Sequence, residues 1–202
     1  MGKILLSISC FILLLGCSTT PVGSGKETDV GVWQGKVQML SKESKNRKWA
    51  YVTWISDSPN QRMRIDVRAV LDIPIATYIR KEDGAHLWLF TEGKYFHSKD
   101  ATQLFSTLVK FNFDPDHFFN FLGNPQKLGK SWECENKLSL YTCLSPSREA
   151  QVTINHENVD KRVINLNKGS KGLRIRLSRS KVRVTAQQFK KLSTSQFDII
   201  EI

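Results

Sequence analysis

The strictest alternation of apolar and polar residues lies between Arg62 and Ile79. Every second residue from Met63 to Ile75 is apolar, and the positions between them begin with Arg64, Asp66 and Arg68. The apolar series contains Met63, Ile65, Val67, Ala69, Leu71, Ile73 and Ile75. Because successive side chains of a strand point to opposite faces, the pattern predicts a strand with one apolar and one polar face.

The apolar series continues past Pro74, which cannot donate a hydrogen bond to a sheet. We therefore expect the strand to run into a turn or loop whose tip is apolar. Such a tip is unusual in a soluble protein, and it is the first indication of function. The alternative is a kinked strand whose apolar end is covered by another element.

Other predicted strands are joined by short polar turns, which predicts an antiparallel meander. These segments are residues 32–39, 49–55, 86–90 and 95–96. Further strands are expected later in the chain, at residues 132–135, 138–144, 152–154, 162–166, 173–177, 182–184 and 196–200.

Two helices are predicted between these groups of strands. Asp100 and Gln103 resemble a capping box, and apolar residues follow at helical spacing: Leu104, Phe105, Leu108 and Val109. A second helix is expected from Asp114 to Gly123, with Pro115 at its first position and an aromatic-rich face of Phe118, Phe119, Phe121 and Leu122. Helices this apolar must be buried, and the concave face of the meander is the available partner.

The first residues resemble the signal peptide of a bacterial lipoprotein. Lys3 precedes a short apolar run, and the run ends in a lipobox-like sequence, Leu14-Leu15-Gly16-Cys17. The resemblance implies a signal peptide at residues 1–16, cleavage before Cys17, and acylation of Cys17 at its sulfur and amine. Three acyl chains would anchor the protein essentially permanently. Residues 17–31 are then a lipidated tether and residues 32–202 a single domain, and Ser18 after the cysteine favours sorting to the outer membrane.

Cleavage would remove one lysine and no acid, so the formal net charge would fall from +11 to +10. Residues 163–191 contain nine lysines or arginines and no acidic residue. Basic strands suit phosphate groups, and a membrane-anchored protein outside the cytosol would meet anionic lipid headgroups or an acidic protein partner rather than nucleic acid. A merely solvated basic face is the alternative.

Cys134 and Cys143 remain once the signal peptide is removed and Cys17 is lipidated. In an exported protein such a pair predicts a disulfide. A metal-binding pair is the weaker alternative, because the four histidines are scattered: His86, His97, His117 and His156.

Catalytic signals are weak. Asp114, Asp116 and His117 lie together, but a helix N-terminus explains both carboxylates. The sequence has no Gly-x-Ser-x-Gly, phosphate loop or His-Glu-x-x-His motif. We therefore expect no enzyme, cofactor or metal.

Several motifs, in order along the chain, resemble the outer-membrane lipoprotein receptors of the lipoprotein-localization system (LolB), part of the LolA/LolB superfamily. Besides the lipobox, they are Trp33-Gln34-Gly35-Lys36, Val52-Thr53-Trp54, Arg62-Met63-Arg64-Ile65, Val70-Leu71, Leu122-Gly123-Asn124-Pro125 and Leu173-Arg174-Ile175-Arg176-Leu177. The resemblance implies an α+β, mainly β fold: an unclosed antiparallel half-barrel of about eleven strands, lidded by short helices over an apolar cavity. The Cys134/Cys143 pair and the compressed segment 145–163 depart from the family pattern.

The resemblance also implies a function for the cavity and the apolar loop. The expected protein receives lipoprotein acyl chains from a periplasmic LolA-like carrier and, as a monomer, inserts them into the outer membrane. Leu71, with Ile73 nearby, falls on the exposed membrane-insertion leucine of the family. The expected cavity residues are Trp33, Met39, Trp54, Met63, Ile65, Val67, Leu87, Leu89, Phe105, Leu108, Phe118, Phe119 and Leu122. The alternative is a lipid-anchored structural or regulatory envelope protein of the same fold with a filled core.

Overall fold

The fold was analysed in a computed structural model of the chain. The structure describes residues 30–41, 49–104, 122, 132–145, 149–158 and 160–201. Within these residues no helix is long and apolar enough to cross a membrane.

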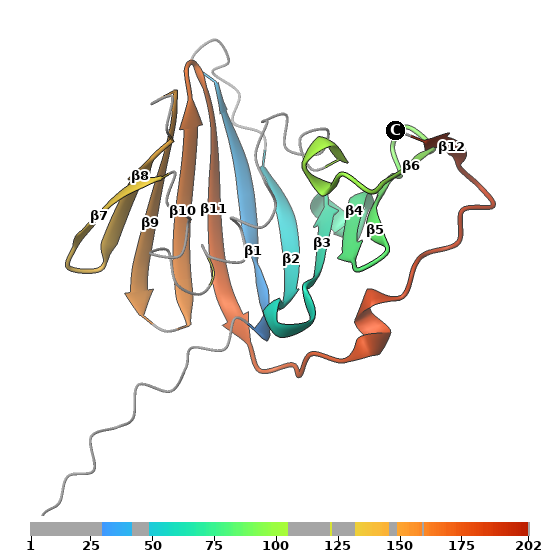
Figure 1. The fold of residues 1–202 in the computed structure, drawn as a ribbon, viewed down its shortest axis with the longest axis horizontal. Helices are drawn as coiled ribbons and strands as arrows, with labels where there is room; N and C mark the ends of the chain where they lie inside the picture. The colour runs from blue at the N-terminus through green and yellow to red at the C-terminus, as the bar shows by residue number, and fades with distance from the viewer. Residues whose placement is uncertain are drawn as a thin grey trace, which may run out of the picture.

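The described residues form one twelve-stranded sheet (Figure 1). Its strands are β1 (Val30–Ser41), β2 (Trp49–Asp57), β3 (Arg62–Arg68), β4 (Pro74–Lys81), β5 (Gly84–Leu89), β6 (Lys94–Ser98), β7 (Glu133–Lys137), β8 (Leu140–Leu144), β9 (Ala150–Asn158), β10 (Lys161–Lys168), β11 (Lys171–Ser180) and β12 (Asp198–Glu201). Their order in the sheet is β12-β6-β5-β4-β3-β2-β1-β11-β10-β9-β8-β7.

The sheet is curved and open. β12 and β7 lie at its two ends, and β7 to β11 face β4 to β6 across the concave side (Figure 1). All neighbouring strands are antiparallel except β12, which runs parallel to β6. The predicted mainly β, unclosed half-barrel is confirmed, with a mixed twelve-stranded sheet in place of about eleven antiparallel strands.

The alternation in β3 orients the sheet. Met63 and Ile65 are buried on the concave side with Val67 partly buried beside them, whereas Arg64 and Asp66 form an ion pair on the outer face. The concave face carries the largest apolar cluster, made of Trp33, Val52, Trp54, Met63, Ile65, Ala76, Tyr78, Ala85, Leu87, Leu104, Leu122, Cys143, Val152, Ile154, Ile164, Leu166, Leu173, Ile175 and Leu177. The predicted two-faced strand is therefore confirmed.

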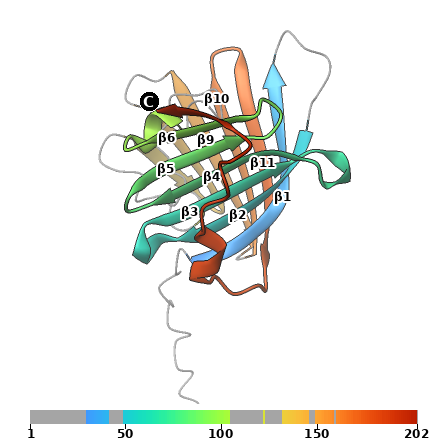
Figure 2. The same ribbon diagram turned by 90° about the vertical axis from the view of Figure 1, so that its right-hand side faces the viewer.

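The chain after β11 crosses the outer face of the sheet before it forms β12 (Figure 2). A short 3-10 helix, η4 (Ala186–Phe189), buries Phe189 against Val32 and Ile55, and Phe197 packs farther along in a cluster with Trp88. The predicted strand at residues 182–184 is wrong: the chain leaves the sheet after Ser180. The predicted last short strand is confirmed as β12.

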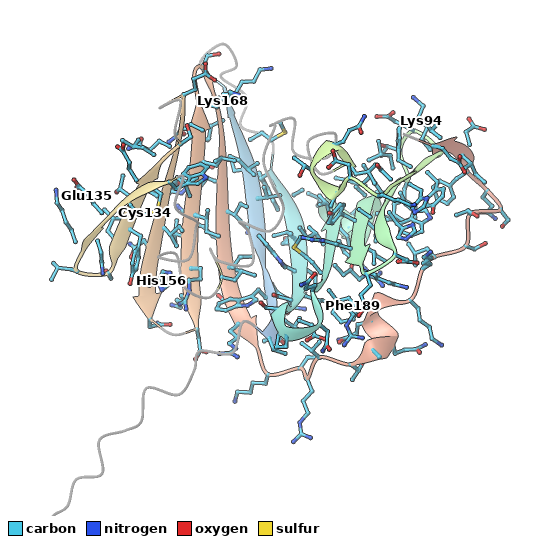
Figure 3. The ribbon with its side chains drawn as sticks, viewed as in Figure 1. Lys94, Cys134, Glu135, His156, Lys168 and Phe189 are labelled. Carbon is cyan, nitrogen blue, oxygen red and sulfur yellow. A yellow bond between two sulfur atoms is a disulfide. The ribbon has the colours of Figure 1, made fainter. Side chains whose placement is uncertain are left out.

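Two local features explain motifs in the sequence. Cys134 and Cys143 form the predicted disulfide, which joins β7 to β8 at opposed positions of this edge hairpin (Figure 3). Gly35 lies where β1 and β11 approach closely, because a Cβ atom there would come within 1.7 Å of the Arg176 carbonyl oxygen. Only glycine fits that position without displacing the backbone of β11.

Candidate functional site

The concave apolar face brings together most of the predicted cavity residues that the structure describes. Buried residues of its one cluster are Trp33, Trp54, Met63, Ile65, Leu87 and Leu122, and Val67 and Leu89 pack against it partly buried. Met39 lies outside the cluster, 53% exposed near the end of β1. Phe105, Leu108, Phe118 and Phe119 lie outside the described residues.

Both described parts of the predicted helical region reach this face. Asp100 caps a helical turn at residues 101–104, because its Oδ1 accepts hydrogen bonds from the backbone N–H groups of Thr102 and Gln103, at 2.9 and 3.3 Å. The predicted N-terminus is thus confirmed. Leu104 and Leu122 are 0% and 2% exposed within the concave cluster, which joins this region to the sheet.

A buried arginine, which the sequence analysis did not single out, lies beside this cluster. Arg162 is 1% exposed, and its guanidinium carbon lies 5.2 Å from the centre of the Trp33 ring. It donates hydrogen bonds to the backbone carbonyls of Asn158 at 2.6 Å and Leu122 at 3.4 Å. Burial, and secondarily the charge of Arg162, lower the pKa of His156 to about 4, so His156 is neutral at neutral pH. These contacts tie Leu122 to β9 and β10.

The loop between β3 and β4 exposes three apolar side chains to solvent. It forms a short 3-10 turn, η2 (Val70–Asp72), in which Val70 is 53% exposed and Leu71 88% exposed, and the following Ile73 is 54% exposed. An apolar tip with this exposure agrees with the prediction from the alternation.

Its conformation is held by two interactions across its base. The Ala69 N–H donates to the Ile73 carbonyl at 2.8 Å, and Arg68 pairs with Asp72 at 2.8 Å. Leu71 itself has a φ of 64°, a conformation that costs a residue with a Cβ roughly 1–2 kcal/mol. The loop therefore presents an apolar side chain to solvent in a defined and strained backbone conformation.

A pocket of about 500 Å³ opens on the outer face at the base of this loop. It is lined by Gln34, Gly35, Tyr51, Val52, Thr53, Asp66, Arg68 and Asp72. Its two carboxylates are already bonded, since Asp66 accepts from Thr77 at 2.7 Å and from Arg64 at 2.9 Å, and Asp72 accepts from Arg68. This pocket could not be predicted from the sequence, because its lining comes from four elements and has no contiguous motif.

Metal-ligating side chains do not gather at either region among the residues described. No cluster of three or more His, Cys, Asp or Glu side chains is present there. The acids and histidine that the sequence places together, Asp114, Asp116 and His117, lie outside the described residues.

A scan against family models and a search of curated proteins found no match. Among solved structures the chain is similar to an uncharacterized conserved protein from Thermus thermophilus, at 11% identity and a TM-score of 0.47, over 88% of this chain and 94% of that one. It is also similar to LolA superfamily protein NE2245 from Nitrosomonas europaea, at 6% identity and a TM-score of 0.43, over 81% and 91% of the two chains. With both TM-scores below 0.5, neither similarity assigns this chain to a family.

Proposed function

We propose that this chain is a lipid-anchored, monomeric envelope protein that binds the acyl chains of other lipoproteins and inserts them into the outer membrane. Cys17 would carry the anchor, the concave face would hold the guest chains, and Leu71 would enter the bilayer. The chain would act as a carrier and not as an enzyme, and a periplasmic LolA-like protein would supply the cargo.

The observation that carries the proposal is the exposure of Leu71 on a loop that leaves an open, apolar-lined sheet. A membrane-inserting side chain must protrude from the fold, and an acyl-chain site must be apolar and accessible. The described residues provide the first of these and an apolar face for the second.

The driving force is the hydrophobic effect. Each methylene removed from water contributes about 0.8 kcal/mol, so a chain of about 16 carbons is worth roughly 12 kcal/mol. A carrier therefore has to shield most of the acyl chain from water, and release of the acyl chain requires a bilayer at the opening of the site. An apolar loop tip would bring this opening to the bilayer.

The rival function is that of a lipid-anchored structural or regulatory protein with a filled core. It is favoured by the complete burial of Met63, Tyr78 and Leu87 in the concave cluster. Val67 and Leu89 favour the carrier, because they leave apolar surface of this face only partly covered.

Lipid extraction separates the two functions. All the described strands and apolar clusters come from residues 30–201, so a chain starting at Ser18 retains them. We expect mass spectrometry of this purified chain to find acyl lipids, and a fluorescent fatty-acyl probe to compete for them. A chain that holds no lipid and takes up no probe would contradict the carrier function and favour the rival.

A matched pair of variants locates the site. Val67→Glu places a carboxylate on the concave face, whereas Gln151→Glu places one on the exposed outer face of β9. We expect Val67→Glu to weaken probe binding by about tenfold or more, because a charge is costly to bury beside an acyl chain. Gln151→Glu should bind as the parent chain does, and equal binding by both variants would place the lipid elsewhere.

A further inference from the structure

A row of basic and aromatic side chains crosses the outer face of the sheet at the base of the loop that carries Leu71. In register, Arg176 of β11 opposes Lys36 of β1, Lys36 opposes Tyr51 of β2, and Tyr51 opposes Arg68 of β3. Opposed residues of antiparallel strands share a face, and four strands about 4.8 Å apart span roughly 14 Å. One register step away, Arg174 and Trp49 both oppose Gln38 on the same face.

We name this set the basic–aromatic row: Lys36, Trp49, Tyr51, Arg68, Arg174 and Arg176. Its cations have few acidic partners. Arg68 pairs with Asp72, but Lys36 and Arg176 are exposed and form no ion pair with the described residues. The Nε atom of Arg174 is buried without a hydrogen-bond partner. The exposed charges of Lys36 and Arg176 are therefore available to an anion from outside the chain, and the partly buried Arg174 adds to the positive charge beside them.

The aromatic members are half-exposed and hold the lysine in place. Trp49 and Tyr51 are each 43% exposed and meet edge to face, with ring centres 5.2 Å apart. The Lys36 Nζ lies 4.8 Å from the Trp49 ring centre and 5.6 Å from that of Tyr51. A cation over a ring keeps its N–H donors free for an anion. Half-exposed Trp and Tyr beside cations are typical of the headgroup level of a membrane.

The nearby acids leave the row with a net positive charge, because Asp72 pairs with Arg68 alone among its cations. Asp66 and Asp72 both line the adjoining pocket, but each already accepts hydrogen bonds from an arginine, Arg64 and Arg68 respectively. The row therefore keeps its positive charge beside an exposed leucine only three residues beyond Arg68.

From this juxtaposition we infer that the basic–aromatic row binds the phosphate groups of anionic phospholipid headgroups while Leu71 enters the apolar layer beneath them. The inference rests on the proposed function for the membrane at which the loop acts. An acidic protein surface would match the charges but not the apolar tip, whereas a bilayer offers phosphate and hydrocarbon at adjacent depths. Lipid headgroups are therefore the occupant that both features favour.

The test is vesicle flotation of the chain starting at Ser18, which lacks the acylated cysteine. Vesicles contain either phosphatidylcholine alone or equal parts of phosphatidylglycerol and phosphatidylcholine. Each basic residue near an anionic surface is worth about fivefold in binding. We therefore expect Lys36→Gln/Arg176→Gln to weaken binding to the anionic vesicles by about 25-fold. Salt should weaken binding of the parent chain in the same way.

A control with the same change in net charge is Lys94→Gln/Lys137→Gln, which removes two partly or fully exposed lysines of β6 and β7. It should bind within about twofold of the parent chain, since these residues lie outside the row. The inference is overturned if the two double variants bind equally, or if the parent chain shows no preference for anionic vesicles. If the first double variant fails to fold, Lys36→Gln alone should still lose about fivefold.

Binding of the fatty-acyl probe, measured on the same samples, separates this inference from the proposed function. The row variant should keep probe binding, because its residues face away from the concave cluster. Loss of vesicle preference with retained probe binding supports the row as a headgroup site. Absent probe binding in the parent chain contradicts the carrier function, whatever the vesicles show.

Discussion

Replacement of Leu71 by glycine separates the stability of the loop from its function. Leu71 is 88% exposed and has a φ of 64°, so the native fold gains little from its side chain and tolerates its strained backbone. Glycine adopts that φ without the cost of a Cβ. We therefore expect Leu71→Gly to change the free energy of unfolding by no more than about 1 kcal/mol, in either direction.

The loss in the free energy of membrane binding should be larger than this change in the free energy of unfolding. A leucine side chain contributes about 1.5–3 kcal/mol when it is moved from water into hydrocarbon, and at 88% exposure nearly all of it is available to a bilayer. Leu71→Gly should lose about 2 kcal/mol of free energy of membrane binding. This corresponds to a decrease of roughly 30-fold in vesicle partitioning or in the rate of lipoprotein insertion. Leu71→Glu should lose more, because the carboxylate resists transfer into hydrocarbon.

The β7–β8 turn supplies a matched control. Leu138 is 100% exposed and has a φ of 59°, so Leu138→Gly makes the same chemical change in the same backbone conformation. Thermal unfolding should shift similarly in the two variants, whereas flotation and insertion should fall only for Leu71→Gly. Equal losses in function, or unfolding of Leu71→Gly, would refute the assignment of Leu71 as the inserting residue.

Three further predictions concern the scaffold. Burial is the main reason that the pKa of His86 is lowered from 6.5 to about 4. Between pH 6.5 and 4 the unfolded chain therefore binds more protons than the folded chain, so the free energy of unfolding should fall as the pH drops. In urea titrations, His86→Phe should reduce that fall by at most about 3 kcal/mol. Reduction of Cys134–Cys143, nine residues apart, should cost about 2–3 kcal/mol and speed amide exchange in β7 and β8; unchanged exchange would contradict this. Gly35→Ala should lower the free energy of unfolding by about 1–3 kcal/mol or more in the same titrations, because its Cβ would overlap the Arg176 carbonyl. An unchanged free energy of unfolding would show that β11 can move to make room.

The sheet was predictable because its signal is local. The alternation around Met63 and the turns between the first strands fixed the faces and the antiparallel order of β1 to β6. The exposed tip at Leu71 was predictable from the same pattern. Pro74, however, is the first residue of β4 and not part of the loop, since the first position of a strand tolerates a missing hydrogen-bond donor.

The outer face was not predictable in the same way, because it depends on contacts between distant segments. Val182 and Val184 alternate as in a strand, yet the chain there leaves the sheet; Val182 is 55% exposed and Val184 packs beside Phe189. No single stretch of sequence reveals the row from Arg176 to Arg68, because its residues come from four strands that only the sheet register brings together. The basic composition of residues 163–191 indicated anion binding but not its geometry.

The two halves of the outer face explain each other. Over β4 to β6 the sheet has apolar outward side chains such as Ile79 and Trp88, and Leu192 and Phe197 pack against them. Figure 2 shows the C-terminal segment crossing this part of the sheet. The basic–aromatic row lies beyond this cover, on the parts of β11, β1, β2 and β3 away from Val32 and Ile55, and it consists of cations and half-exposed rings. The C-terminal segment covers apolar outer surface elsewhere, yet Trp49 and Tyr51 stay 43% exposed near the loop that carries Leu71. This uncovered face therefore suits a partner that is itself part polar and part apolar. For the membrane-anchored function proposed above, a phospholipid surface would offer both properties at once.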